Sequence, residues 1–162
     1  MYFNLEEENM KKILLGMLLL GSVAYAKVED VLGTWITEKA DTGNQIIVEI
    51  YQAQNGKYNG RVLELTMPIY TEGEYQGKER MDLQNPNPQL KHRKLVGIDF
   101  VSNFDYNEGK DKFEHGNIYS PINGKTYHSY MQLQKDGRLL VKGSIDKSGL
   151  IGKKQYWTRY KK

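Results

Sequence analysis

The sequence contains no cysteine, and it has only three histidines among its 162 residues. Without cysteine the chain can form no disulfide and no thiolate site, so its stability must come from packing and hydrogen bonding. The histidines stand far apart, at positions 92, 115 and 128, unlike the closely spaced ligands of typical metal sites. We therefore expect no bound metal.

Sequence motifs for catalysis are also absent. The chain has no GxSxG, HExxH or phosphate-loop pattern, which removes the common templates for nucleophilic, zinc-dependent and nucleotide-dependent enzymes. Asp82 with Glu79 or Glu72 offers an acid and a base, but acids in a surface loop usually face solvent. We predict no catalytic residue and no cofactor. An envelope hydrolase is a less favoured interpretation than ligand binding or a structural role.

Long hydrophobic runs are missing except for one near the N-terminus. Residues 10–26, MKKILLGMLLLGSVAYA, carry two lysines, an apolar run and small residues before the last alanine, which is the pattern of a secretory signal peptide. The run is shorter than the ~20 residues of a membrane-spanning helix, so we expect no membrane span. We predict cleavage after Ala26 and export to the periplasm, the cell envelope or the exterior.

Residues 1–9, MYFNLEEEN, do not fit a signal peptide, because three glutamates precede the lysines. We interpret Met10 as the translation start, since purine-rich glutamate codons before it resemble a ribosome-binding site. Residues 27–162 then form one domain of common size. Removing two lysines and three glutamates with the first 26 residues leaves a net charge of +4. This small, scattered excess predicts no nucleic-acid binding, and the oligomeric state stays open.

From Gly33 onward the apolar residues alternate with a period of two, and turn dipeptides separate short apolar stretches. Asn55-Gly56, Asn123-Gly124 and Asp136-Gly137 are typical of β-hairpins. The pattern predicts an all-β fold, a small up-and-down antiparallel β-barrel of about eight strands, because closure removes exposed sheet edges.

Alternation also assigns the inner face of two strands. In residues 95–101, LVGIDFV, it places Val96, Ile98 and Phe100 inward. In the strand that follows Asn123-Gly124, the inner face consists of Tyr127, Ser129, Met131 and Leu133.

Two sequence features are expected to join the first and last strands of the barrel. Gly33-x-Trp35 in the first strand and Arg159 in the last resemble the pair that marks lipocalin-like barrels, in which the arginine lies across the tryptophan. A guanidinium over a desolvated tryptophan contributes about 1–2 kcal/mol. We assign structural roles to Gly33, Trp35 and Arg159.

The mature chain more specifically resembles DUF2147, a family of exported bacterial proteins of unknown function. The matching stretches, in order, are GTWIT, YNGRVLEL, DLQNPNPQLKHRKLVG, GNIYSPINGKTY and GLIGKKQYWTR. The resemblance implies a barrel and an envelope location, and it brings no established activity. The family tends to have aspartate where this chain has Ser120 or Asn87, which weakens any idea of carboxylate chemistry there.

The connection from Thr66 to Lys91 is long for a compact barrel, and such loops are often lids or binding elements. Asn87-Pro88 predicts a short helical turn within it. Asp82 and Arg93 bracket this turn at a spacing that allows an ion pair. The candidate ligand-binding residues are Asp82, Asn85, Arg93, Tyr119, Tyr127 and Trp157.

Two interpretations of this loop stay open, a corner held together by its own contacts and a lid over a ligand, and we favour the corner. For the whole protein we predict binding of a small amphiphilic or glycan-like envelope molecule in the barrel mouth. The alternative is a structural or protein-interaction module of the envelope. A hollow interior with a few polar groups would favour ligand binding, and a filled interior would favour the alternative.

We predict that the exported protein begins at Lys27. N-terminal sequencing of protein recovered outside the cytoplasm should return KVEDVLG, the sequence that cleavage after Ala26 leaves. A different first residue, or retention in the cytoplasm, would contradict the signal-peptide assignment.

Overall fold

A computed structural model of the protein describes residues 28–161. The predicted start at Met10 and the predicted signal peptide lie outside these residues. The chain divides into a first unit that ends at Val31 and a compact unit that begins at Leu32. In the part of the chain that is described, no helix has the length and apolar character needed to cross a membrane.

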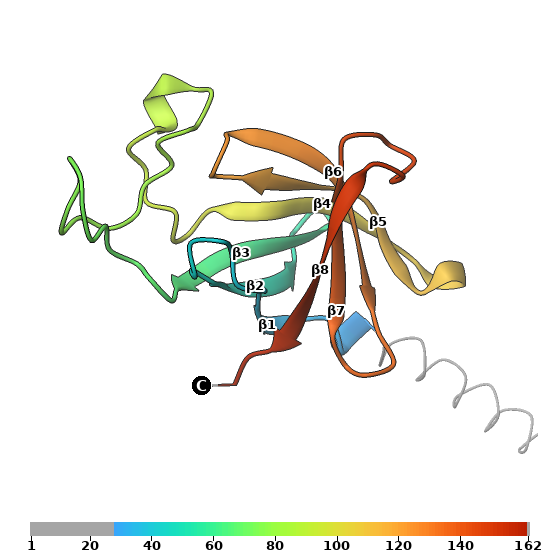
Figure 1. The fold of residues 1–162 in the computed structure, drawn as a ribbon. Coiled ribbons are helices and arrows are strands. Elements are labelled where there is room, and N and C mark those ends of the chain that lie inside the picture. Colours follow the sequence, from blue (N-terminus) through green and yellow to red (C-terminus); the bar gives the residue numbers. More distant parts are fainter. Residues whose placement is uncertain (1–27, 162) are drawn as a thin grey trace, which may run out of the picture. The chain divides into compact units, whose positions relative to one another are not determined.

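The compact unit is a closed barrel of eight strands, shown in Figure 1. The strands are β1 (Gly33–Ile36), β2 (Ile46–Gln52), β3 (Tyr58–Leu65), β4 (Asp99–Asn107), β5 (Lys112–Ser120), β6 (Lys125–Leu133), β7 (Leu139–Ser144) and β8 (Gly152–Arg159). Each strand pairs antiparallel with the next, and β1 pairs with β8. The described helical elements of this unit are two 3-10 turns, η1 (Pro88–Leu90) and η2 (Glu108–Lys110). The predicted all-β, up-and-down, lipocalin-like fold is confirmed.

The predicted inward alternation of residues 95–101 is wrong at its beginning. β4 starts only at Asp99, and Val96 is 41% exposed. The buried residues of β4 are Phe100, Val101 and Phe104. Asn103 has a left-handed backbone with a φ of 64°, and the pairing of β3 with β4 shifts register twice. Such bulges break strict alternation, so the period of two does not assign this strand correctly.

Large side chains fill the middle of the barrel. The rings of Phe100 and Trp157, from β4 and β8, stack with centroids 5.7 Å apart. At Gly116 on β5 an added Cβ would lie 2.3 Å from the Phe104 ring, so only glycine fits beside that ring. The largest buried side chains include Trp35, Trp157, Phe104, Phe113 and Met131.

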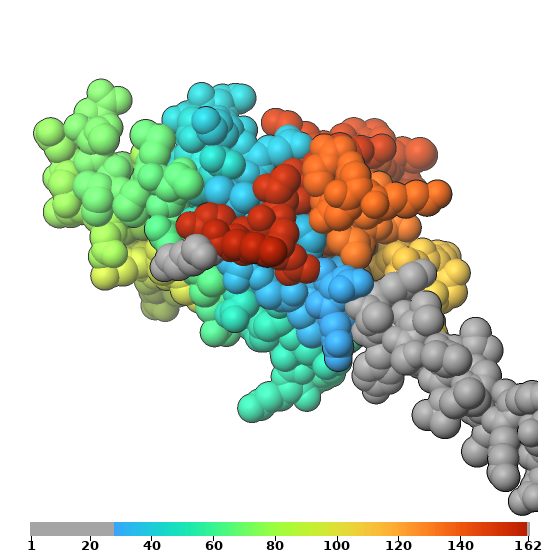
Figure 2. All heavy atoms as spheres, turned by 90° about the horizontal axis from the view of Figure 1, so that it is seen from below, coloured from blue at the N-terminus to red at the C-terminus, as the bar shows by residue number. Residues whose placement is uncertain are grey.

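Arg159 closes the barrel against Trp35. Its Cζ lies 4.0 Å from the centroid of the Trp35 ring, and its Nη1 donates to the Leu32 carbonyl oxygen at 2.7 Å. A Cβ at Gly33 would lie 3.1 Å from the same Nη1, so glycine there leaves room for the guanidinium. In Figure 2 the red C-terminal atoms lie against the blue atoms of the first strands, as the β1–β8 pairing requires.

The connection between β3 and β4, residues 66–98, has ordered structure of its own and extends from the barrel wall in Figure 1. Isolated bridges join Ile69 to Glu79 and Met81 to Lys94. The predicted helical turn is η1, where the Asn87 side chain accepts from the backbone N–H of Gln89 at 3.0 Å. The loop therefore presents its side chains from a defined backbone.

We predict that Trp35→Ala lowers the free energy of unfolding by about 3–5 kcal/mol, as for other buried aromatic residues. Arg159→Ala should cost less, because it removes the cation–π contact and one hydrogen bond. Arg138→Ala is a matched control, since the Arg138 guanidinium lies over the Tyr156 ring in the same kind of contact but outside the β1–β8 pairing. Denaturant unfolding checks all three, and unchanged stability of both closure variants would contradict this account of the closure.

Candidate functional site

Asp82 is fully buried although it lies in the long connection. Its backbone N–H donates to the Arg93 carbonyl oxygen at 3.0 Å, and its own carbonyl oxygen accepts from the Asn85 N–H at 2.9 Å. These contacts are local in sequence, so the loop itself positions the carboxylate. A buried carboxylate is costly unless its oxygens accept hydrogen bonds.

Four donor groups satisfy the Asp82 carboxylate. Tyr119 on β5 donates its hydroxyl to Oδ1 at 2.5 Å. Oδ2 accepts from Asn85 Nδ2 at 2.7 Å, and from Arg93 through Nε at 3.0 Å and Nη2 at 2.8 Å. We call Asp82, Asn85, Arg93 and Tyr119 the Asp82 cluster. Because both oxygens are engaged, the cluster fastens the loop to β5 by charge-assisted hydrogen bonds.

The hydroxyl of Tyr119 remains un-ionised over a wide pH range. Burial raises its pKa to about 12, and the hydrogen bond to Asp82 acts in the same direction. A neutral phenol is the form that can donate to a carboxylate. Tyr119 therefore keeps the proton that it donates to Asp82 at any physiological pH.

Gly124 allows the same loop to approach the β5–β6 turn. A Cβ at this position would lie 1.9 Å from the Gln84 carbonyl oxygen, and the φ of Gly124 is +69°. Both the close backbone and the left-handed conformation require glycine. The loop thus lies against this hairpin at two places, at Gly124 and at Tyr119.

The structure brings together four of the six predicted ligand-binding residues, Asp82, Asn85, Arg93 and Tyr119. Tyr127 lies on the other face of the hairpin, because it pairs with Ile118, whereas Tyr119 pairs with Thr126. Trp157 is 0% exposed and stacks on Phe100. It belongs to the packed core, so it is not available to a ligand that arrives from solvent.

The inner face of the β5–β6 hairpin carries a different set of side chains. β7 pairs with β6 only from His128 onward, so the three residues of β6 before it extend past the end of β7. Tyr127 and Ile118 are only partly buried there. Their inner position follows from Gly143 of β7, where a Cβ would meet Ile118 Cγ2 at 2.9 Å and Tyr127 Cβ at 3.9 Å.

Ser129 is one step deeper on the inner face of β6. Its side chain is buried, and its Oγ has no hydrogen-bond partner among the described residues. A buried hydroxyl without a partner is unusual and calls for an explanation. The alternation of β6 placed Ser129 on the core face, but no sequence signal indicated that its hydroxyl would lack a partner.

Two lysines stand at the rim of this inner face. Lys125 lies two residues before Tyr127 on β6 and is exposed. Lys153 on β8 pairs directly with Gly143 and is also exposed. Side chains two residues apart, or directly opposite in a pair, share a face. We define the rim face as Ile118, Lys125, Tyr127, Ser129 and Lys153.

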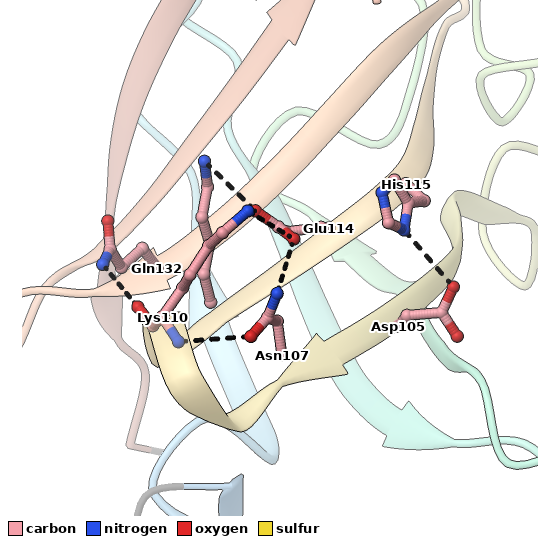
Figure 3. Close-up of polar contacts among 7 residues, drawn as sticks. Asp105, Asn107, Lys110, Glu114, His115 and Gln132 are labelled. Carbon is pink, nitrogen blue, oxygen red and sulfur yellow. Dashed lines mark hydrogen bonds and ion pairs between the residues drawn. The ribbon is translucent and has the colours of Figure 1, made fainter.

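A second polar cluster surrounds Glu114 at the β4–β5 hairpin (Figure 3). Glu114 accepts from Asn107 Nδ2 at 3.0 Å and from Lys110 Nζ at 3.1 Å. Burial raises the pKa of Glu114, but the hydrogen bonds from Asn107 and Lys110 outweigh it and lower the pKa below its ordinary value. Gln132 of β6 donates to the Lys110 carbonyl oxygen at 3.5 Å. These contacts stabilise the β4–β5 hairpin, which is a sufficient structural role for the cluster.

His115 lies next to this cluster on the outer side of β5 (Figure 3). Its Nδ1 is 3.6 Å from Asp105 Oδ2, and Asp105 Oδ1 accepts from Lys57 Nζ at 2.6 Å. The His115 side chain is 77% exposed. Across residues 28–161 the structure shows no group of three or more histidine and acidic side chains able to hold a metal.

A surface depression of about 310 Å³ lies on the outside of the barrel. It is lined by Thr34, Ile47, Leu63, Glu64 and Tyr160. None of the predicted ligand-binding residues and none of the rim-face residues belongs to this lining. The depression is therefore separate from the Asp82 cluster and from the rim face.

Comparison with known proteins gives a family and a fold. The DUF2147 family, described as an uncharacterized protein conserved in bacteria, matches residues 33–159. Protein HP1028 from Helicobacter pylori, described as belonging to the lipocalin family, is similar in structure with a TM-score of 0.67 and 27% identity. That similarity covers 81% of this chain and 83% of HP1028. A search of curated proteins finds no match.

We predict that Tyr119→Phe lowers the free energy of unfolding by about 1.5–3 kcal/mol at pH 7, because it removes a hydrogen bond to a charged group. A folded-state pKa of about 12 exceeds the ordinary value near 10. The contribution is therefore fully present below pH 10 and is lost as the pH rises through 12. Unfolding from pH 7 to pH 12 should show parent and variant converging.

The control is Tyr127→Phe, which removes a hydroxyl from the same hairpin but on the other face. The Tyr127 hydroxyl accepts from Asn123 near the surface at 2.9 Å, so its removal should change stability by less than about 0.5 kcal/mol. Equal losses in the two variants would show that the Asp82 cluster does not stabilise the loop.

Proposed function

The chain belongs to the DUF2147 family, and we propose that it is an exported cell-envelope protein that binds a small amphiphilic or glycan-like ligand at its rim face, without catalysis. The lipocalin-like barrel supports ligand binding in general. The choice of the rim face rests on the polar and apolar groups gathered there. Export rests on the pattern of residues 10–26.

The unpartnered Ser129 Oγ is the observation that carries this proposal. A ligand hydroxyl or carbonyl that reaches this atom would supply the hydrogen bond it lacks. Ser129 also marks a boundary on β6, because Met131 below it is fully buried while Tyr127 above it is partly exposed. Ligand contact is therefore expected from Ser129 outward to the end of the barrel.

The side chains above Ser129 define the chemistry of the ligand. Tyr127 and Ile118 offer apolar surface, and the tyrosine adds a polar tip. Lys125 and Lys153 at the rim would attract an anionic or strongly polar head group. The set matches a small amphiphile whose apolar part lies on Tyr127 and Ile118.

The Asp82 cluster has a positioning role in this proposal. It fastens the long loop to the outer face of β5 through Tyr119, on the strand whose inner face carries Ile118. The Arg93 guanidinium is committed to Asp82 through Nε and Nη2. Holding the loop against the hairpin keeps the rim face in one arrangement, and such preorganisation favours binding.

The packed middle of the barrel supports the alternative of a structural or interaction module. Across residues 28–161 the buried side chains pack the middle of the barrel, unlike the open interior that holds large ligands in wider barrels. The rim face is consistent with a compact ligand that does not enter this packed region. An envelope hydrolase has less support, because both oxygens of buried Asp82 are engaged in hydrogen bonds.

The test is the binding of an anionic fluorescent amphiphile, 8-anilinonaphthalene-1-sulfonate, to the chain that begins at Lys27. We predict that Tyr127→Ser weakens binding about tenfold, equivalent to roughly 1.4 kcal/mol. Tyr156→Ser is the matched control, because Tyr156 lies on the outer face of β8 next to inward-facing Trp157. The control should bind like the parent.

Ser129→Ala separates ligand contact from structure. Removing an unpaired buried hydroxyl should leave the melting temperature unchanged or raise it, while binding weakens. Arg93→Lys should lower the melting temperature, because lysine lacks the planar guanidinium that contacts Asp82 through two nitrogens. Probe binding by this variant should persist. The proposal is wrong if the parent does not bind the probe, or if Ser129→Ala and Tyr127→Ser bind it as the parent does. Displacement by a neutral oligosaccharide but not by a fatty acid would identify a glycan-like ligand.

A further inference from the structure

The turn between β7 and β8 exposes three large aliphatic side chains. Ile145 is 72%, Leu150 83% and Ile151 65% exposed. The Ile145 N–H donates to the Ile151 carbonyl oxygen at 2.9 Å, so these two residues oppose each other and their side chains share one face. We call residues 145–151 the β7–β8 tip.

Hydrogen bonds hold this apolar tip in a defined shape. The Asp146 carboxylate accepts from the backbone N–H groups of Leu150 at 3.0 Å and Ile151 at 2.8 Å, and from the Ser148 hydroxyl. The Lys142 ammonium donates to the Gly149 carbonyl oxygen. The aliphatic side chains are therefore presented outward by an ordered turn.

The strands behind the tip are rich in lysine. Lys142 and Lys154 are direct cross-strand partners, and like charges in that arrangement destabilise a hairpin. Lys153 precedes Lys154, and Lys147 lies in the tip itself. The one carboxylate of the tip, Asp146, is occupied by the turn. An anionic surface would relieve the repulsion among these lysines.

We propose that the β7–β8 tip docks the protein on an anionic lipid bilayer, with Leu150, Ile151 and Ile145 entering the interface and the exposed Lys147 and Lys154 facing lipid head groups. Apolar side chains flanked by basic ones are the chemistry of interfacial membrane binding. Each lysine close to an anionic membrane strengthens binding about fivefold.

The size of the apolar tip favours a bilayer over a protein partner. Three aliphatic side chains cannot supply the ~800 Å² that each partner buries in a standard protein interface. A bilayer needs only a few inserted apolar groups together with electrostatic attraction. Apolar insertion and electrostatic attraction can be distinguished experimentally, because salt screens only the electrostatic attraction.

The experiment is co-sedimentation of the chain that begins at Lys27 with vesicles of phosphatidylcholine, alone or mixed with phosphatidylglycerol. This chain retains the whole compact unit from Leu32 and omits the N-terminal apolar run, which would bind lipid by itself. We expect binding to the mixed vesicles that weakens as salt rises. Leu150→Ser with Ile151→Ser should weaken it about tenfold or more, and Lys147→Gln with Lys154→Gln about tenfold or more.

Leu63→Ser with Val96→Ser is the matched control, since both residues are 41% exposed aliphatics outside the tip. This control should bind vesicles like the parent, and all variants should keep the parent's melting temperature within a few degrees. Absence of binding to the anionic vesicles overturns the proposal, as does binding that the tip variants do not weaken. Light scattering that shows self-association lost in the tip variants, with no vesicle binding, would instead assign the tip to contacts between copies of this chain.

Discussion

The closure between β1 and β8 is the contact on which the barrel depends. Among the described residues, two pairs join these strands, Trp35 with Arg159 and Ile36 with Thr158, and the Tyr160 N–H donates to the Thr34 carbonyl oxygen at 2.9 Å, so the backbone ladder alone is short. Arg159 adds its contact with the Trp35 ring and its hydrogen bond to the Leu32 carbonyl oxygen. The packed interior exists only while the sheet is closed, because an open sheet would expose the inward aromatic residues to water.

The sequence predicts the barrel well because turn dipeptides separate short apolar stretches of strand length. The hairpin glycines Gly56, Gly124 and Gly137 all have positive φ, as their turn dipeptides require. The prediction fails at residues 95–98, because β4 begins only at Asp99 and its register against β3 shifts between Gly60 and Arg61. Such register shifts depend on how β4 pairs with β3, so residue patterns along the chain do not reveal them.

Contacts between residues close in sequence were the predictable part of the Asp82 cluster and the rim face. Asp82 and Arg93 are 11 residues apart on either side of a capped turn, and the sequence was sufficient to expect their ion pair. The contact of Asp82 with Tyr119 spans 37 residues and depends on how the loop lies against β5. The unpartnered hydroxyl of Ser129 depends on every neighbour in the interior, which no short-range pattern contains.

Antiparallel order places the rim face and the β7–β8 tip at the same end of the barrel. The β5–β6 and β7–β8 hairpins both lead from an odd-numbered to an even-numbered strand, and in a closed meander all such turns share one end. The β5–β6 turn also carries Ile122, which is 75% exposed. If the tip docks on a bilayer, the rim face opens close to the lipid surface. An amphiphilic ligand could then pass between membrane and protein without crossing bulk water, where exposure of its apolar part is costly.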